Sequence, residues 1–201
     1  MNIACLDFEG VLVPEIWIGL AQRTGIDELK LTTRDIPDYD ELMTYRLDLM
    51  RRHSLHFRDI QAAADALEPL PGAAEFIAWL RTKFQVAILS DTFYELAGPL
   101  LRKLDYPMML CHRLEVDADD RIVGYCLRQP DPKRAAVKAF RSMNYKIVAA
   151  GDSYNDISML QEADLGLLFC PPEKVIADYP EFGVSRSYGE LKEAFVSISD
   201  G

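Results

Sequence analysis

Two carboxylates lie one residue apart at the end of the first apolar segment of the chain. Residues 3–6 are apolar, Asp7 follows them, and Glu9 comes two residues later, before Gly10. A carboxylate at a strand end can hold a metal ion, take up a proton or attack phosphorus. Such an aspartate is often only a turn residue, but the second acid favours a shared chemical site.

A second acidic group lies in the stretch GDSYND, residues 151–156. Asp152 follows another apolar run, and Asn155 and Asp156 stand where a helix is expected to begin. A helix N-cap explains one of these acids but not the whole group. Carboxylates that converge from different strands repel each other unless a cation lies between them, and hard oxygen ligands with room for water favour Mg²⁺. The pattern therefore predicts a magnesium site.

A hydroxyl and a lysine stand at two further positions of the same kind. Ser90 ends the apolar run that begins at residue 84, and Lys133 lies in the first turn of a predicted helix. The three histidines form no recognisable triad with Ser90, so we favour binding of phosphate oxygens over a nucleophilic role; a turn serine is the alternative. A lysine at a helix start is electrostatically unfavourable, which indicates that Lys133 either faces an anion or is simply solvated.

Short apolar runs and helical segments must position these residues. Apolar runs precede Asp7, Ser90 and Asp152, and a fourth begins at Leu165. Helical spacing is found between them, at residues 72–84, 94–104 and 132–143, the second expected to be bent or broken near Gly98–Pro99. This alternation predicts an α/β fold with a Rossmann-like, open and mostly parallel sheet. Ligands bind at the carboxyl ends of such strands, so the polar residues should meet in one crevice.

Two segments do not alternate in this way. Residues 14–70 show helical patterns without a strand, which predicts a helical cap inserted after the first strand into a core of residues 1–13 and 71–201. Residues 111–127 contain two strand-like runs on either side of Asp119–Asp120, and they predict a small β-hairpin.

Net charge, apolar run lengths and cysteine spacing limit the classes of partner and the location expected for the protein. The chain has 201 residues and a net charge of −10, which disfavours nucleic acid because the surface repels phosphate backbones. No apolar stretch reaches the roughly 18 residues of a membrane span, and no signal peptide is recognisable. The four cysteines show no paired spacing, so we expect buried free thiols and a cytoplasmic protein. A homodimer is expected on general grounds only.

In order along the chain, LDFEG, VAILSD, Lys133 and GDSYND resemble the four motifs of the haloacid dehalogenase superfamily of phosphohydrolases. The resemblance implies that Asp7 attacks phosphorus and forms an aspartyl-phosphate, while Glu9 acts as general acid and base. It implies that Ser90 and Lys133 balance charge on the transferring phosphoryl group.

The same resemblance implies the metal ligands. Asp7, Asp152 and the backbone carbonyl of Glu9 would hold Mg²⁺, and Asp156 would support the metal shell or orient Lys133. Most of the superfamily carries Asp-x-Asp in the first motif, whereas this chain carries Asp-x-Glu. Our hypothesis is that Glu9, one methylene longer, favours an alcohol over water as phosphoryl acceptor.

The predicted cap contributes one basic and one acidic candidate. Arg46 falls within an apolar stripe of a helix at 39–53, and Glu15 follows Pro14. Arg46 either extends from the edge of that stripe to solvent or binds a carboxylate in the crevice, and Glu15 either favours a helix start or binds an ammonium group. Together they would bind an amino acid. Asp91 and Asn155 are further candidates for substrate binding.

The pairing of Arg46 and Glu15 resembles the phosphoserine phosphatase branch, including members that transfer the phosphoryl group from phosphoserine to homoserine. The resemblance thus implies two small-molecule substrates and a role in serine and threonine biosynthesis. Two alternatives stay open at this point: a phosphatase for another small phosphomonoester, and a phospho-accepting signalling domain. The latter class is shorter and lacks a cap, and its acidic residues are adjacent.

Overall fold

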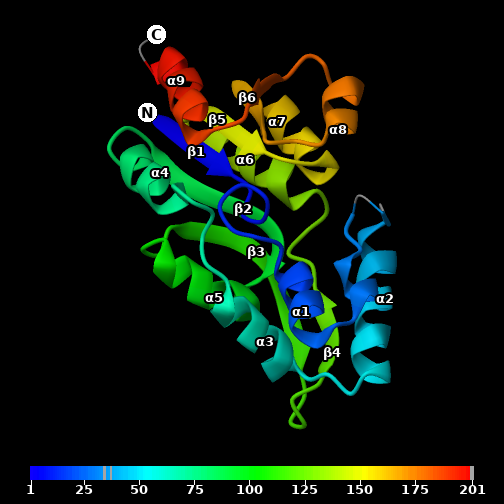
Figure 1. Ribbon diagram of the computed structural model, residues 1–201. Helices are drawn as coiled ribbons and strands as arrows, with labels where there is room; N and C mark the ends of the chain where they lie inside the picture. Colours follow the sequence, from blue (N-terminus) through cyan, green and yellow to red (C-terminus); the bar gives the residue numbers. More distant parts are fainter. Residues whose placement is uncertain (34, 37, 200–201) are drawn as a thin grey trace.

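A seven-stranded sheet forms the centre of the protein in the computed structural model, which describes residues 1–33, 35–36 and 38–199 (Figure 1). The strand order is β4-β3-β2-β1-β5-β6-β7. All neighbours pair in parallel except β3 and β4, which are antiparallel. The strands are β1 Asn2–Leu6, β2 Gln85–Phe93, β3 Met108–Val116, β4 Ile122–Cys126, β5 Lys146–Gly151, β6 Leu165–Phe169 and β7 Gly183–Ser185. The predicted α/β fold and the hairpin are confirmed.

The register of the three central strands brings the candidate residues together. Leu6, the last residue of β1, pairs with Ile88 of β2 and with Ala150 of β5. Asp7 follows directly, and its N–H donates a hydrogen bond to the Ala150 carbonyl over 2.9 Å. The polar residues just beyond these positions in each strand therefore share one edge of the sheet.

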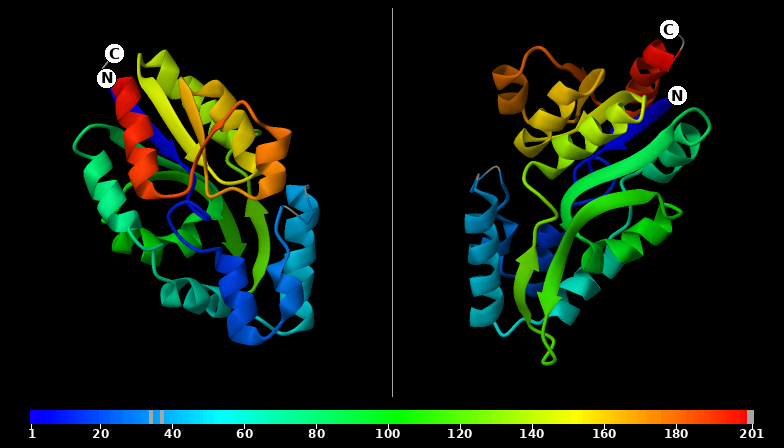
Figure 2. Two further views of the ribbon diagram at one scale, coloured as in Figure 1. Left: turned by 45° about the horizontal axis from the view of Figure 1, so that its top comes forward. Right: turned by 180° about the vertical axis from the view of Figure 1, so that it is seen from behind.

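Helices cover both faces of the sheet (Figure 2). Because side chains alternate along a strand, Ala4 and Leu6 join one hydrophobic cluster with α4, α5 and α9, while Ile3 and Cys5 join another with α6, α7 and α8. These helices are α4 Ala73–Leu80, α5 Tyr94–Lys103, α6 Pro132–Ser142, α7 Ile157–Glu162, α8 Glu173–Asp178 and α9 Tyr188–Ser199.

Three local predictions were wrong in whole or in part. The helix expected over 72–84 ends at Leu80, and Phe84 is buried beyond the helix end. Helix α5 continues through Pro99 without a break, because the buried residues on either side of the proline hold it against the core. All four cysteines are free as expected, but Cys126 and Cys170 are exposed.

Within residues 14–70, the described part of the chain forms helices and no strand of the sheet, as predicted. They are α1 Ile16–Thr24, the 3-10 helix η1 Asp27–Lys30, α2 Tyr39–Arg52 and α3 Phe57–Ala66. They lie together at the β4 end of the sheet (Figure 2). Hydrogen bonds join them to the hairpin: the Tyr125 hydroxyl donates to Asp40 Oδ1 over 2.6 Å, and the N–H groups of Phe57 and Arg58 donate to the carbonyl and to Oδ2 of Asp120 over 2.8 and 3.3 Å. We propose that residues 14–70 act as a cap domain over a core of residues 1–13 and 71–201.

Asp38 begins α2 as its N-cap, since its side chain accepts the Glu41 N–H over 2.8 Å. The helix then buries Leu42, Met43, Leu49 and Met50, with Arg46 between them on the same face.

None of the helices in the described ranges combines the length and the apolar composition that a membrane span requires.

Candidate active site

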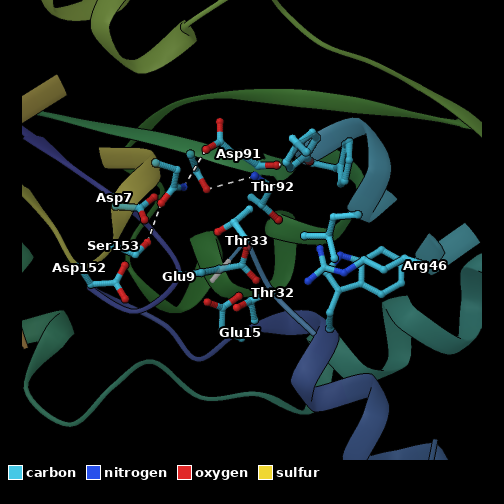
Figure 3. Close-up of a pocket in the computed structure, with 16 residues that line it drawn as sticks. Asp7, Glu9, Glu15, Thr32, Thr33, Arg46, Asp91, Thr92, Asp152 and Ser153 are labelled. Carbon is cyan, nitrogen blue, oxygen red and sulfur yellow. Dashed lines mark hydrogen bonds between the residues drawn. The ribbon is translucent and has the colours of Figure 1, made fainter. Parts of the chain in front are cut away.

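A pocket opens where β1, β2 and β5 end, beside the helices inserted after β1 (Figure 3). Its walls combine core residues with residues of the insertion. Eight of the candidates from the sequence line it: Asp7, Glu9, Glu15, Arg46, Ser90, Asp91, Asp152 and Asn155. The other two, Lys133 and Asp156, lie behind Asp7. Lys133 contacts Asp7 directly, and Asp156 contacts Lys133.

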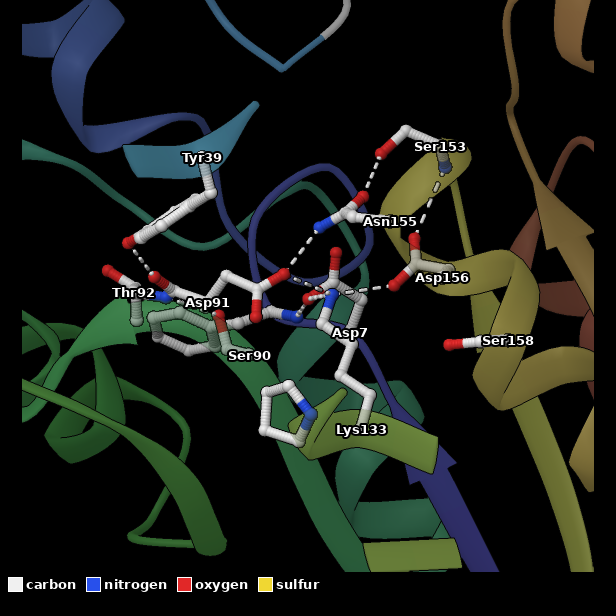
Figure 4. Close-up of polar contacts among 12 residues, drawn as sticks. Asp7, Tyr39, Ser90, Asp91, Thr92, Lys133, Ser153, Asn155, Asp156 and Ser158 are labelled. Atoms are coloured by element: carbon white, nitrogen blue, oxygen red, sulfur yellow. Dashed lines mark hydrogen bonds and ion pairs between the residues drawn. The ribbon is translucent and has the colours of Figure 1, made fainter. Parts of the chain in front are cut away.

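Lys133 is a buried cation enclosed by acids. Its Nζ atom lies 2.6 Å from Asp156 Oδ1, 2.9 Å from Asp7 Oδ1 and 3.6 Å from Asp91 Oδ2 (Figure 4). Burial alone would lower the pKa of Lys133, but the carboxylates of Asp156, Asp7 and Asp91 outweigh it and hold that pKa well above its usual value. The lysine therefore stays charged beside Asp7, which accounts for its unusual place in the first turn of α6.

Asp156 is fully buried, and both of its carboxylate oxygens accept hydrogen bonds from protein donors. Oδ1 accepts from Lys133, and Oδ2 accepts from the backbone N–H groups of Asp152 and Ser153 over 2.9 and 3.2 Å. A side chain at Gly151 would place its Cβ 2.3 Å from the Asp156 Cβ, so only glycine fits there. Asp156 is thus built to orient Lys133 and the loop after β5.

Asp7, Asp152 and Asp156 offer carboxylate oxygens that all lie within 4.8 Å of one another. Both Asp156 oxygens accept from protein donors, whereas Asp7 and Asp152 line the pocket and are therefore better placed to hold a cation. Burial, and next the negative charge of Asp156, raise the pKa of Asp7 well above its usual value. A divalent cation would offset the repulsion between these carboxylates. Gly10, at φ +82°, lets the backbone approach the Asp152 carboxylate, because a Cβ there would lie 2.5 Å from Oδ2. The donor set fits Mg²⁺.

Glu9 points toward the insertion. Its Oε1 accepts the Ile16 N–H, at the start of α1, over 2.7 Å. Desolvation, and next the charge of Glu15, raise the pKa of Glu9 to about 8, although Ile16 and Arg46 oppose the shift. A carboxyl group with this pKa can hold a proton near neutral pH and deliver it to a leaving oxygen.

Arg46 reaches the pocket from α2 and is only 6% exposed. Its Nη2 donates to the Leu31 carbonyl over 2.9 Å, and its guanidinium carbon lies 4.8 Å from the centre of the Trp17 ring. Among the described residues, Arg46 Nε has no hydrogen-bond partner. Leaving a buried donor unpaired is costly, so an acceptor from a ligand would suit this position. Glu15, the N-cap of α1, makes no capping bond with its side chain and lines the same pocket.

Sequence reasoning missed two residues beside Asp91. His112 of β3 is buried, with its Nε2 3.4 Å from Asp91 Oδ1. The Tyr39 hydroxyl, from α2, donates to the Asp91 carbonyl over 2.7 Å. The sequence does show a histidine inside a strand and a tyrosine at a helix start. Their contact with Asp91 could not be predicted from this, because it depends on which strands are neighbours in the sheet.

Asp91 itself accepts the Asn155 amide through Oδ2 over 2.8 Å. Burial would raise the pKa of Asp91, but Lys133 and the hydrogen bonds from His112 and Asn155 outweigh it and lower that pKa. Asp91 is therefore held ionised at the wall of the pocket.

Comparison with known proteins places this site in a family. The pattern that describes haloacid dehalogenase-like hydrolases matches residues 1–164. The chain belongs to the haloacid dehalogenase-like hydrolases. Among curated relatives of this hydrolase, phosphoserine phosphatase ThrH of Pseudomonas aeruginosa is 58% identical over 99% of this chain and 97% of that protein. The phosphoserine phosphatase of Pseudomonas syringae pv. tomato is 57% identical over 100% of this chain and 84% of that protein.

Solved structures show the same fold for this hydrolase. A phospho-aspartyl intermediate analogue of phosphoserine phosphatase superposes with a TM-score of 0.79 at 20% identity, covering 96% of this chain and 98% of that chain. A substrate-bound phosphoserine phosphatase complex gives 0.79 at 20% identity, covering 96% and 97%.

Proposed function

We propose that this hydrolase removes the phosphoryl group from phosphoserine and passes it to water or to homoserine. The observation that carries the proposal is a single pocket in which Asp7, beside buried Lys133, faces Arg46 and Glu15. The first pair suits phosphoryl transfer, and the second suits the two charges of an amino acid. The similarity to two phosphoserine phosphatases over nearly the whole chain supports the same substrate.

In the first half of the reaction, an Asp7 oxygen forms a bond to phosphorus while the bond from phosphorus to the seryl oxygen breaks. Glu9 gives its proton to that oxygen, and serine leaves. Lys133 neutralises the phosphoryl oxygens, and Ser90, buried in β2 at the wall of the pocket, donates its hydroxyl to them. Magnesium, held by Asp7, Asp152 and the backbone carbonyl of Glu9, would supply further positive charge.

In the second half, the acceptor hydroxyl gives its proton to Glu9 and attacks phosphorus, and the bond between phosphorus and Asp7 breaks. Water yields inorganic phosphate, and homoserine yields phosphohomoserine. Both acceptors meet the same aspartyl-phosphate, so the ratio of products reports how Glu9 places the acceptor. The longer Glu9 side chain, anchored by the Ile16 N–H, supports a geometry that favours an alcohol.

Recognition of the amino-acid part falls to the insertion. The Arg46 guanidinium, with Nε unpaired, would bind the carboxylate, and Glu15 would bind the ammonium group. Asp91 and Asn155 line the same pocket, and their direct contact with substrate stays a prediction. Two further predictions, a homodimer and a cytoplasmic location, rest on the sequence alone.

Phosphorus NMR tests the proposal in one assay. Purified protein is incubated with Mg²⁺ and phosphoserine, with and without homoserine, and Asp7→Asn serves as the inactive control. We expect free phosphate in both reactions and phosphohomoserine only in the second. Free phosphate alone would leave a phosphatase without transferase activity. No turnover would redirect the search to other phosphomonoesters, and a lasting phosphoprotein would favour a signalling domain.

A further inference from the structure

Groups from different parts of the fold contact both oxygens of the Asp91 carboxylate. Oδ1 faces His112 Nε2 at 3.4 Å, and Oδ2 accepts the Asn155 amide at 2.8 Å and lies 3.6 Å from Lys133 Nζ. The side chain is 23% exposed, and that of His112 is 3% exposed. Histidine, asparagine and lysine thus fix the position of one carboxylate beside the nucleophile.

The hydrogen bonds of His112 define which ring nitrogen carries the proton. The Arg128 backbone N–H donates to His112 Nδ1 over 3.2 Å, so Nδ1 is an acceptor and carries no hydrogen. The ring hydrogen is then on Nε2, which faces Asp91. His112 therefore links two parts of the fold: its Nδ1 accepts the Arg128 N–H, after β4, and its protonated Nε2 lies 3.4 Å from Asp91 Oδ1.

The charges around Lys133 show what this donation does. Three aspartates compete for one ammonium group, and Asp91 is the most distant of them, at 3.6 Å. Donors on both oxygens of Asp91 hold it at that distance and spread its charge. Without the His112 donor, Asp91 is free to rotate toward Lys133, and Lys133 is drawn away from Asp7.

The cap contributes to the same arrangement. Tyr39 donates its hydroxyl to the Asp91 carbonyl, and its ring packs edge-on against the His112 ring with centroids 6.0 Å apart. Asp91 is therefore held through its side chain by the core and through its backbone by the insertion.

We propose that His112 is a positioning residue for phosphoryl transfer: its Nε2–H fixes Asp91, and Asp91 in turn fixes the Asn155 amide and the Lys133 ammonium group beside Asp7. This inference rests on the proposed function. His112 is not among the described residues that line the pocket, so we expect its effect to fall on the chemical step rather than on the binding of the amino acid.

Three substitutions separate the two hydrogen bonds of His112. His112→Gln places an amide N–H near the position of Nε2 and keeps the donation to Asp91. His112→Asn keeps an acceptor for the Arg128 N–H but does not reach Asp91, and His112→Leu loses both bonds. His53→Gln, at an exposed histidine, is the matched control.

Steady-state kinetics with phosphoserine and Mg²⁺ give the decisive comparison. We expect His112→Asn and His112→Leu to lower kcat by about tenfold or more, the scale of a lost hydrogen bond to a charged group, with KM nearly unchanged. His112→Gln should recover most of kcat. Wild-type kcat in His112→Asn, or an equal loss in His112→Gln, would overturn the inference.

A spectroscopic test covers the case in which a variant unfolds. Long-range ¹⁵N–¹H NMR of the wild-type histidines should show one ring protonated at Nε2 alone, whose signals vanish in His112→Gln. The opposite tautomer at that position would refute the geometry. If the wild-type protein turns over no phosphoserine, the proposed function fails, whereas the NMR result still decides whether His112 donates to Asp91.

Discussion

Replacement of Arg46 by methionine should separate amino-acid recognition from phosphoryl transfer. Methionine keeps an unbranched stem over Trp17 and removes the guanidinium. Arg46 is 6% exposed, so water does not readily take the place of a lost charge. Removing one partner of a buried, hydrogen-bonded charge pair costs about 2–5 kcal/mol. Because about 1.4 kcal/mol is tenfold, kcat/KM for phosphoserine should fall by roughly 30- to 5000-fold.

The assay compares phosphoserine with phosphoethanolamine, which has the ammonium group but no carboxylate. With Arg46→Met, kcat/KM for phosphoethanolamine should change by less than about threefold, because this substrate has no group that Arg46 would bind. Arg51→Met is the matched control, since Arg51 is exposed on the same helix and should tolerate the change. Equal losses for the two substrates would refute carboxylate recognition by Arg46.

Three further predictions concern Glu9 and the metal. The raised pKa of Glu9, about 8 against an ordinary 4.5, stabilises the fold fully below pH 4.5 and loses that stabilisation as pH rises through 8. Thermal melts of Glu9→Gln without added metal should therefore lose less stability than wild type between pH 5 and 9, and parallel curves would contradict this pKa. Glu9→Asp should lower the ratio of phosphohomoserine to phosphate, and an unchanged ratio in an active variant would sink the acceptor hypothesis. Chelation should abolish turnover and Mg²⁺ should restore it; full activity in excess chelator would argue against a metal at Asp7 and Asp152.

Candidates at the strand ends were predictable because local sequence and the general geometry of parallel sheets are enough to place them. Asp7, Ser90 and Asp152 each follow an apolar run, and the carboxyl ends of parallel strands meet at one edge. His112 was not predictable in this way. It lies inside β3, and its contact with Asp91 arises only because β3 pairs with β2 in the observed register.

Local helix limits were predicted less well for a different reason. Apolar spacing continues past Leu80 to Phe84, but Phe84 is buried after the chain has left the helix. Gly98–Pro99 predicted a bent or broken helix, yet α5 is unbroken, because the buried Leu96 and Leu100 on either side of Pro99 hold it against the core. In both cases tertiary packing outweighs local preference.

The insertion places the proposed substrate-recognition residues and the proposed phosphoryl-transfer residues in two different parts of the chain. The nucleophile, Lys133 and the acidic loop after β5 belong to the sheet and its helices, whereas Arg46 and Glu15 belong to residues 14–70, which leave and rejoin the core at neighbouring strands. A new substrate could therefore evolve, or be engineered, by rewriting the insertion alone. Tyr39 limits such changes, because its hydroxyl donates a hydrogen bond to the Asp91 carbonyl, beside Ser90 in the core. A replacement cap must supply an equivalent contact.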